Sequence, residues 1–264
     1  MSMMTGVLIS ALLVGGTGVF IGIFLGIAGK KFAVEVDEKE VAVREALPGN
    51  NCGGCGYPGC DGLAKAIAAG EAPAGACPVG GEPVAKKIGA IMGADAGAER
   101  RMVAFVHCIG DCDQTTENYN YEGVRDCGML RYVPTGGPKS CHDGCTGYGT
   151  CVKACPFEAI HVTNGVAVVN KEACKACKKC IAACPKHLIS LVPYDASAHI
   201  ACSAKGKGKA VMSTCKVGCI TCRKCEKNCP EAAITMEGNT PVIDYDKCVS
   251  CGKCKDDCVR TCIL

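Results

Sequence analysis

Cysteines at cluster-binding spacings are the residues of this chain that could do chemistry. The chain has 26 cysteines in 264 residues, and two sets of eight repeat each other at an offset of 74 residues. The first set is Cys141, Cys145, Cys151, Cys155, Cys174, Cys177, Cys180 and Cys184, and the second is Cys215, Cys219, Cys225, Cys229, Cys248, Cys251, Cys254 and Cys258. Thiolates in a Cys-x2-Cys-x2-Cys-x3-Cys run hold [4Fe–4S] clusters, and the fourth cysteine ligates the neighbouring cluster. The two sets therefore predict four clusters in series, an arrangement that carries single electrons.

The exchange of the fourth cysteine predicts which cysteines share a cluster. The expected sets are Cys141, Cys145, Cys151 and Cys184; Cys174, Cys177, Cys180 and Cys155; Cys248, Cys251, Cys254 and Cys229; and Cys219, Cys222, Cys225 and Cys258. The last set has an alternative, because the repeat maps Cys215, and not Cys222, onto Cys141. We favour Cys222, since it would otherwise crowd the same loop unused, although Val259 replaces the usual proline after Cys258.

A separate four-cysteine motif precedes the two sets. Cys52, Cys55, Cys60 and Cys77 follow the spacing C-x2-C-x4-C-x16-C, with glycines among the first three. Glycine lets the backbone pass close to a bound group and turn with positive φ. Four cysteines could also bind zinc, but the glycines and the neighbouring cluster motifs favour a fifth [4Fe–4S] cluster.

Six cysteines remain outside the five expected ligand sets of four. They are Cys108, Cys112, Cys127, Cys202, Cys215 and Cys262. The first three precede the first set of eight, and Cys202 and Cys215 follow it, so the set lies between two cysteine-bearing arms. If its ends lie close together, the arms meet and can hold a sixth cluster. The alternative is buried free thiols, which behave as small hydrophobic side chains, and Cys262 is expected to have no ligand role.

Composition favours bound cofactors over a large packed core. The chain has no Trp, 5 Phe and 34 Gly, and so few large side chains make a poor core at this length. Metal clusters can supply the missing scaffold because metal binding is coupled to folding. A secreted disulfide framework is the alternative for a Cys-rich chain, but cysteines three residues apart fit a loop around one cluster better. Persistent thiolates imply a reducing compartment. The net charge of +3 gives no indication that the chain binds nucleic acid.

The N-terminal segment predicts a membrane anchor. Residues 7–28 carry no charge, and this length of helix spans a bilayer. Lys30 and Lys31 follow directly, whereas residues 1–6 have no basic side chain, so the positive-inside rule places the remaining chain in the cytoplasm. A cleaved signal peptide would have basic residues before a shorter apolar run. Gly18, Gly22 and Gly26 form a small-residue stripe, which predicts a helix partner in the membrane.

The elements that must position the cysteines are short. Asn164-Gly165 between two apolar segments, residues 159–163 and 166–170, predicts a hairpin, and residues 233–236 and 241–245 repeat it. The expected class is α+β: a transmembrane helix, a small four-Cys Fe–S domain and two tandem 2[4Fe–4S] ferredoxin modules. The expected boundaries are 1–30 for the anchor, 31–50 for a linker, 51–95 for the four-Cys domain, 96–138 for a Cys-bearing arm, 139–193 for the first module, 194–214 for a Cys-bearing linker and 215–264 for the second module.

This order of motifs resembles the B subunit of the Rnf complex, in its long form with two ferredoxin modules. The residues that carry the resemblance are the segment 51–60, Cys77-Pro78 and the run from Cys141 to Pro185. The family is a membrane ferredoxin:NAD+ oxidoreductase that couples electron flow to Na+ or H+ translocation. The resemblance implies that this chain accepts electrons from reduced soluble ferredoxin and passes them on. It also implies membrane subunits and a flavin- and NAD-binding peripheral subunit as partners, in agreement with the lack of a nucleotide or flavin motif in this sequence.

Two other functions stay open at this point. A membrane-tethered polyferredoxin could serve a hydrogenase or another dehydrogenase without ion pumping. A redox sensor would need a transducing domain, and no segment is left for one. Because the second module lies farthest along the chain from the anchor, the expected electron order is second module, first module, then the four-Cys domain near the membrane.

Overall fold

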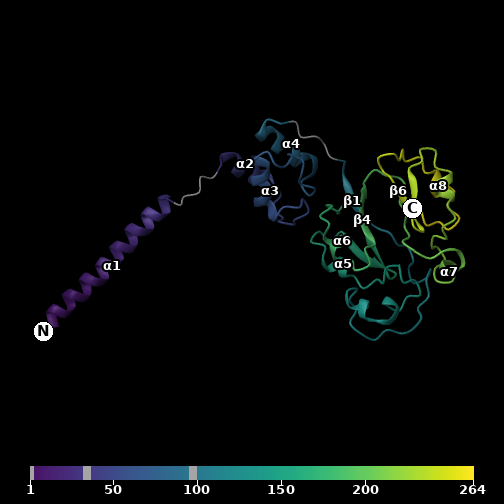
Figure 1. The fold of residues 1–264 in the computed structure, drawn as a ribbon, viewed down its shortest axis with the longest axis horizontal. Helices are drawn as coiled ribbons and strands as arrows, with labels where there is room; N and C mark the ends of the chain where they lie inside the picture. Colours follow the sequence, from purple (N-terminus) through teal and green to yellow (C-terminus); the bar gives the residue numbers. More distant parts are fainter. Residues whose placement is uncertain (1–2, 32–36, 95–99) are drawn as a thin grey trace.

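The computed structural model describes residues 3–31, 37–94 and 100–264. Helix α1 (Met3–Lys31) stands apart from the remaining elements (Figure 1). Within it, the 21 residues Ala11–Lys31 are long and apolar enough to cross a membrane. The large side chains from Leu8 to Ile27 are exposed, as expected of a helix whose apolar surface faces lipid.

The four-Cys motif lies in a small helical domain. It contains α2 (Glu38–Ala46), α3 (Gly59–Ala68) and α4 (Gly81–Met92). Val43, Leu63, Ile67 and Ile88 are at most 1% exposed and form its core, since Leu63 and Ile67 lie four residues apart on one face of α3. The expected linker therefore ends earlier, because α2 packs into this domain; residues 32–36 lie outside the described residues.

The first ferredoxin module contains two antiparallel strand pairs. Strands β2 (Ile160–Thr163) and β3 (Val166–Val169) form the expected hairpin, with Asn164 and Gly165 both at positive φ. The second pair joins β4 (Ile189–Pro193) to β1 (Met102–Val106), with Val106 opposite Ile189. Strand β1 comes from the segment expected to be an arm. It belongs to the module because Val103 of β1 and Val192 of β4 are buried in one hydrophobic core.

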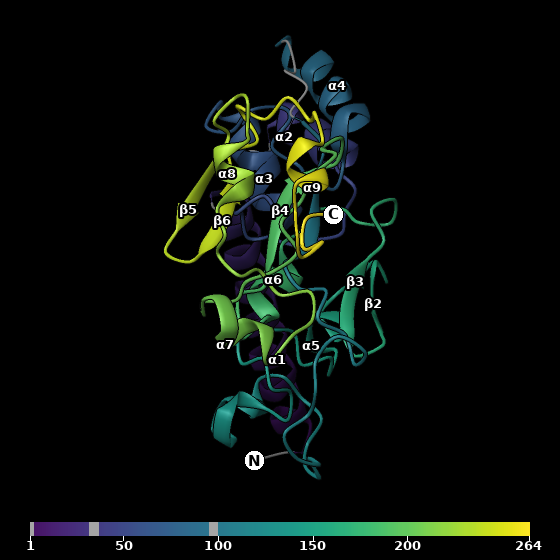
Figure 2. The ribbon, with the colours of Figure 1, turned by 90° about the vertical axis from the view of Figure 1, so that its right-hand side faces the viewer.

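Short helices carry a cysteine of each ferredoxin motif. They are α5 (Thr150–Lys153), α6 (Lys179–Ala183), α8 (Lys224–Lys227) and α9 (Lys253–Asp256). The second module adds the hairpin of β5 (Ile234–Glu237) and β6 (Thr240–Ile243) and is closed by a bridge between Ile200 and Ile263. Figure 2 shows the two hairpins on opposite sides of β4.

The two cysteine-bearing arms meet beside the first module. The first arm contains the 3-10 helices η1 (Met129–Tyr132) and η2 (Pro134–Gly136), and the second contains α7 (Gly208–Met212). Thr115 forms an isolated β-bridge with Cys215, and the Lys216 N–H donates to the Gln114 carbonyl at 2.8 Å. This contact fits the expectation that the arms come together.

Candidate iron–sulfur sites

Two cavities are each lined by four cysteines that the sequence grouped together. Cys155, Cys174, Cys177 and Cys180 line one cavity, and Cys229, Cys248, Cys251 and Cys254 line another. In each, three thiols come from one loop and helix and the fourth from the Cys-Pro end of the other motif. The thiols are thus drawn from two segments of each module, as the exchanged fourth cysteine requires.

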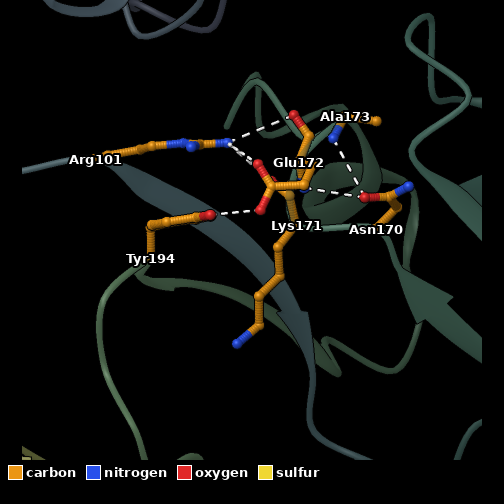
Figure 3. A network of polar contacts seen from close by, with 6 residues as sticks. All are labelled: Arg101, Asn170, Lys171, Glu172, Ala173 and Tyr194. Atoms are coloured by element: carbon orange, nitrogen blue, oxygen red, sulfur yellow. Dashed lines mark hydrogen bonds and ion pairs between the residues drawn. The ribbon is translucent and has the colours of Figure 1, made fainter.

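The loop that carries Cys174 is fixed to the sheet by a polar network (Figure 3). Arg101 lies 3.8 Å over the Tyr194 ring and donates to the Lys171 carbonyl at 3.1 Å. Glu172 pairs with Arg101 and accepts from the Tyr194 hydroxyl. Asn170 accepts from the N–H groups of Glu172 and Ala173, which turns the chain towards Cys174. Residues at the ends of both strands of the β1–β4 pair therefore hold the cysteine loop in place.

A third cavity is lined by five cysteines of the second module. They are Cys219, Cys222, Cys225, Cys258 and Cys262. The ordinary spacing with Cys222 matches this grouping, and Cys215 lies elsewhere. Cys262, for which the sequence predicted no ligand role, is 2% exposed, and its Sγ is 3.5 Å from Cys258 Sγ. Cys262 therefore lies in contact with the sulfur of a proposed ligand.

The lining of the fourth cavity differs from one expected set. Cys145, Cys151 and Cys184 line it, but the fourth cysteine there is Cys127, and not Cys141. The reason lies in the spacing: Tyr148 occupies the position of the second cysteine in an ordinary run. The preceding arm folds back and brings Cys127 to this cavity. The sequence signal that could have found this exchange is the interruption at Tyr148.

Two threonines of the interrupted run position Cys127. The Cys127 N–H donates to Thr150 Oγ1 at 3.0 Å, and Thr146 Oγ1 donates to Cys127 Sγ at 3.4 Å. Burial acts to raise the pKa of Cys127, but the hydrogen bonds from Thr146 and Thr150 outweigh it and hold the pKa below its ordinary value. For Cys151 in the same cavity burial prevails and raises the pKa to about 12. Metal binding must therefore displace a proton from Cys151 at neutral pH.

The remaining candidates fall into two groups. Cys108, Cys141, Cys202 and Cys215 line a fifth cavity. Cys112 lies outside the described cavities: it is exposed, and its N–H donates to the Asn164 carbonyl at 3.0 Å. Of the cysteines expected to share a sixth cluster, Cys108, Cys202 and Cys215 thus line one cavity, which Cys112 and Cys127 do not line.

The four-Cys domain brings its cysteines near one another and near the first module. Burial is the largest cause that raises the pKa of Cys77, and the nearby Cys60 and Cys55 thiols add to it. Asn51 Oδ1 accepts from the Cys60 N–H at 2.8 Å and fixes the loop before α3. The Gly54 backbone lies against Cys177, so that a Cβ at Gly54 would be 2.9 Å from Cys177 Cα.

The cavities share one kind of lining. Each is lined by four or five cysteines. Four thiols around a common space fit a [4Fe–4S] group.

An apolar N-terminal helix followed by a cysteine-lined helical domain and two ferredoxin-like modules defines an iron–sulfur electron-transfer protein. Family models match as "Putative Fe-S cluster" over residues 47–79 and "4Fe-4S dicluster domain" over residues 138–186. The chain is 44% identical over 262 residues to the B subunit of the Na(+)-translocating ferredoxin:NAD(+) oxidoreductase complex of Acetobacterium woodii, covering 99% of this chain and 78% of that protein.

Two further relatives agree. The B subunit of the ion-translocating oxidoreductase complex of Methanosarcina acetivorans is 41% identical over 262 residues, covering 98% of this chain and 99% of that protein. The B subunit of the proton-translocating ferredoxin:NAD(+) oxidoreductase complex of Clostridium ljungdahlii is 39% identical over 233 residues, 88% of this chain and 82% of that protein. The chain belongs to the B subunits of the Rnf family of ion-translocating oxidoreductase complexes.

Proposed function

We propose that this chain is the electron-relay subunit of a membrane ferredoxin:NAD+ oxidoreductase whose electron flow drives Na+ or H+ translocation. The observation that carries the proposal is the row of cysteine-lined cavities, built on both ferredoxin modules of a chain of this family. The chain's part in the complex is electron transfer through these sites. Membrane subunits and a flavin- and NAD-binding subunit complete the reaction.

Five [4Fe–4S] clusters are proposed in this function. The ligand sets are Cys52, Cys55, Cys60 and Cys77; Cys127, Cys145, Cys151 and Cys184; Cys155, Cys174, Cys177 and Cys180; Cys219, Cys222, Cys225 and Cys258; and Cys229, Cys248, Cys251 and Cys254. Bound there, the clusters supply reversible one-electron storage at potentials that the surroundings tune. The chain contributes N–H donors to the sulfurs: Ala104 to Cys174 at 3.3 Å, Leu188 to Cys184 at 3.4 Å and Ala233 to Cys229 at 3.4 Å. Such donors stabilise negative charge on the thiolates.

The assignment of Cys127 gives a direct prediction. Cys127→Ala removes one of four thiols from its cavity, so the chain should lose about four iron atoms. Cys112→Ala is the matched control, because Cys112 is exposed and lies outside the described cavities. Iron and acid-labile sulfide would be measured on anaerobically purified chain. A Cys127→Ala protein with the iron content of the unaltered chain would contradict the assignment.

Exposure supports electron entry at the second module. Among the proposed ligands, Cys222 and Cys251 are exposed, and both belong to this module. Basic residues adjoin them: Arg223 and Lys224 follow Cys222, and Lys253 lies two residues after Cys251. An acidic ferredoxin would be steered to such a surface by opposite charge.

A contact between the first module and the four-Cys domain supports electron exit at the other end of the relay. The Gly54 backbone lies against Cys177, which supports transfer from the first module to the four-Cys domain.

The membrane part of the proposal has its own support. Lys30 and Lys31 lie in the last turn of α1, which supports a single-pass anchor with the Fe–S domains on the cytoplasmic side. Gly18, Gly22 and Gly26 have open space where a side chain would be. A second helix can approach closely along such a stripe.

The glycine stripe predicts a selective assembly defect. Gly22→Leu should leave the chain in the membrane but reduce its copurification with the membrane subunits, because the added side chain holds the partner helix away. Gly16→Leu, on another face of α1, is the control. Quantitative copurification from solubilised membranes tests this, and equal recovery of partners by both variants would rule out the stripe as an interface.

Copurification also tests the proposed function itself. The chain should be isolated with a flavin- and NAD-binding subunit, and the isolated complex should reduce NAD+ with reduced ferredoxin. Recovery with a hydrogenase, without a NAD-binding subunit, would overturn the proposal in favour of a polyferredoxin role.

A further inference from the structure

Four cysteines from separate segments meet in a cavity outside the five proposed sets. Cys108 follows β1, Cys141 precedes the first cysteine run, Cys202 follows the bridge residue Ile200, and Cys215 follows α7. All four line one cavity, and Cys108 and Cys215 are buried. Free thiols packed as hydrophobic side chains have no need to converge from four segments on a common space.

Two glycines keep this space open. A Cβ at Gly144 would lie 3.3 Å from Cys141 Sγ and 3.5 Å from Cys108 Sγ. A Cβ at Gly110 would lie 3.3 Å from Cys215 Sγ and 3.7 Å from Cys108 Sγ. Neither glycine has a positive φ, so backbone conformation does not require glycine here. The remaining physical reason for glycine at both positions is the space that it leaves beside the sulfur atoms.

A buried lysine beside the cavity indicates that the occupant is anionic. Lys139 lines the cavity, is 4% exposed, and donates through Nζ to the carbonyls of Gly110 at 3.0 Å and Gly165 at 2.7 Å. Asp143 also lines the cavity, but it accepts from the Lys205 N–H and forms no ion pair with Lys139. A buried ammonium without a counter-charge is costly. A cluster held by four thiolates supplies negative charge at this position.

The cavity lies between the two ferredoxin modules. Cys108 Sγ accepts from the N–H of Cys145, a proposed ligand in the first module, at 3.3 Å. Cys202 Sγ accepts from the N–H of Cys219, a proposed ligand in the second module, at 3.2 Å. A group bound in this cavity would therefore lie next to a proposed ligand set of each module.

We propose that Cys108, Cys141, Cys202 and Cys215 hold a sixth [4Fe–4S] cluster that links the two modules. Its binding is independent of the proposed function, whereas its part in electron transfer rests on that function. The two cysteines that the repeat maps onto each other, Cys141 and Cys215, serve the same cluster, one from each module. This explains why each is left over when the other cavities are filled.

Native mass spectrometry of the full chain, purified alone in detergent without oxygen, tests the count. Six sets of four irons predict about 24 irons per chain, and five predict about 20. Cys141→Ala and Cys202→Ala should each lose about four, whereas Cys112→Ala should lose none. The unaltered chain decides between the two counts even if a variant fails to fold.

The outcomes separate this proposal from the proposed function. About 20 irons in the unaltered chain, a loss with Cys127→Ala and no loss with Cys202→Ala would overturn the sixth cluster alone. Zinc retained at this site would overturn it as well. A loss with Cys202→Ala but none with Cys127→Ala would support the sixth cluster and contradict the other assignment.

Lys139 provides a readout that does not depend on activity. Lys139→Gln removes the positive charge, so one electron paramagnetic resonance signal should shift to a more negative midpoint potential in a redox titration. Lys86→Gln, at an exposed pair with Glu82 on α4, should shift none. If every potential stays unchanged in Lys139→Gln, the lysine does not face a cluster and the proposal fails.

Discussion

Removing iron from the chain should unfold residues 100–264 while α2, α3 and α4 keep much of their protection. The difference follows from the packing. The largest fully buried side chains are Leu63, Ile67, Ile88, Leu130, Val43, Val103 and Val192. Four of these seven lie in the small helical domain and three in residues 100–264, where cysteines make up a large part of both hydrophobic clusters. The two modules therefore depend on their cofactors for an interior.

The energetic scale makes this effect large. Binding free energy at a structural metal site is folding free energy, about 10–16 kcal/mol in zinc-finger peptides. A whole domain is stabilised by only roughly 5–15 kcal/mol, so the loss of several clusters is expected to unfold the modules.

Hydrogen exchange followed by mass spectrometry, before and after anaerobic chelation, measures this. We expect protection to be lost in β1 to β6 and largely retained in α1, α2, α3 and α4. The helical domain and α1 act as internal controls for damage during chelation. Unchanged protection of the β1–β4 pair in the iron-free chain would contradict the dependence on clusters.

A leucine at Gly54 should uncouple NAD+ reduction from ferredoxin oxidation. Its Cβ alone would lie 2.9 Å from Cys177 Cα and 3.2 Å from the Cys177 carbonyl oxygen, and neither backbone atom can move aside. Overpacking costs about 1–3 kcal/mol, and about 1.4 kcal/mol is a factor of roughly ten in population. We therefore expect the docked arrangement, and with it NAD+ reduction by the complex, to fall roughly tenfold or more.

The distinguishing measurement is cluster reduction without NAD+. In the Gly54→Leu complex, ferredoxin should still reduce the two modules at the normal rate, and the iron content should be unchanged. Ala90→Leu, an exposed position on α4 of the same domain, is the control and should leave both rates unchanged. Normal NAD+ reduction by Gly54→Leu would show that electrons do not pass at this contact.

Local sequence signals predicted the elements that depend only on neighbouring residues. Asn164-Gly165 predicted the β2–β3 hairpin, because few dipeptides allow two successive positive φ values. The apolar run predicted α1, and the buried Leu63 and Ile67 of α3 follow the helical period. Cys155 was grouped with Cys174 because the fourth cysteine of one ferredoxin run ligates the cluster of the other run.

Features that depend on distant residues were not predictable. Strand β1 is short, and its partner β4 begins only at Ile189, so no local pattern marks the pairing. Cys127 and Cys141 are both near the first run, and spacing alone assigned Cys141 to it. The arm that places Cys127 beside Thr150 is a long-range contact that spacing does not show. Cys262 reaches Cys258 only because the chain's last residues return to bridge Ile200. The domain boundaries and cysteine ligation remain predictions.

The pairing of β1 with β4 has a consequence for how the protein is made. Chains emerge from the ribosome N-terminus first, and domains fold as they appear. Residues 38–92 contain all of their own helices, so that domain can acquire iron while later segments are still being translated. The first module cannot close until β4 has left the exit tunnel, and the cavity of Cys108 must wait for Cys215. Iron delivery would therefore proceed from the membrane outwards, and an interrupted supply would leave nascent chains filled near the anchor and empty at the far end.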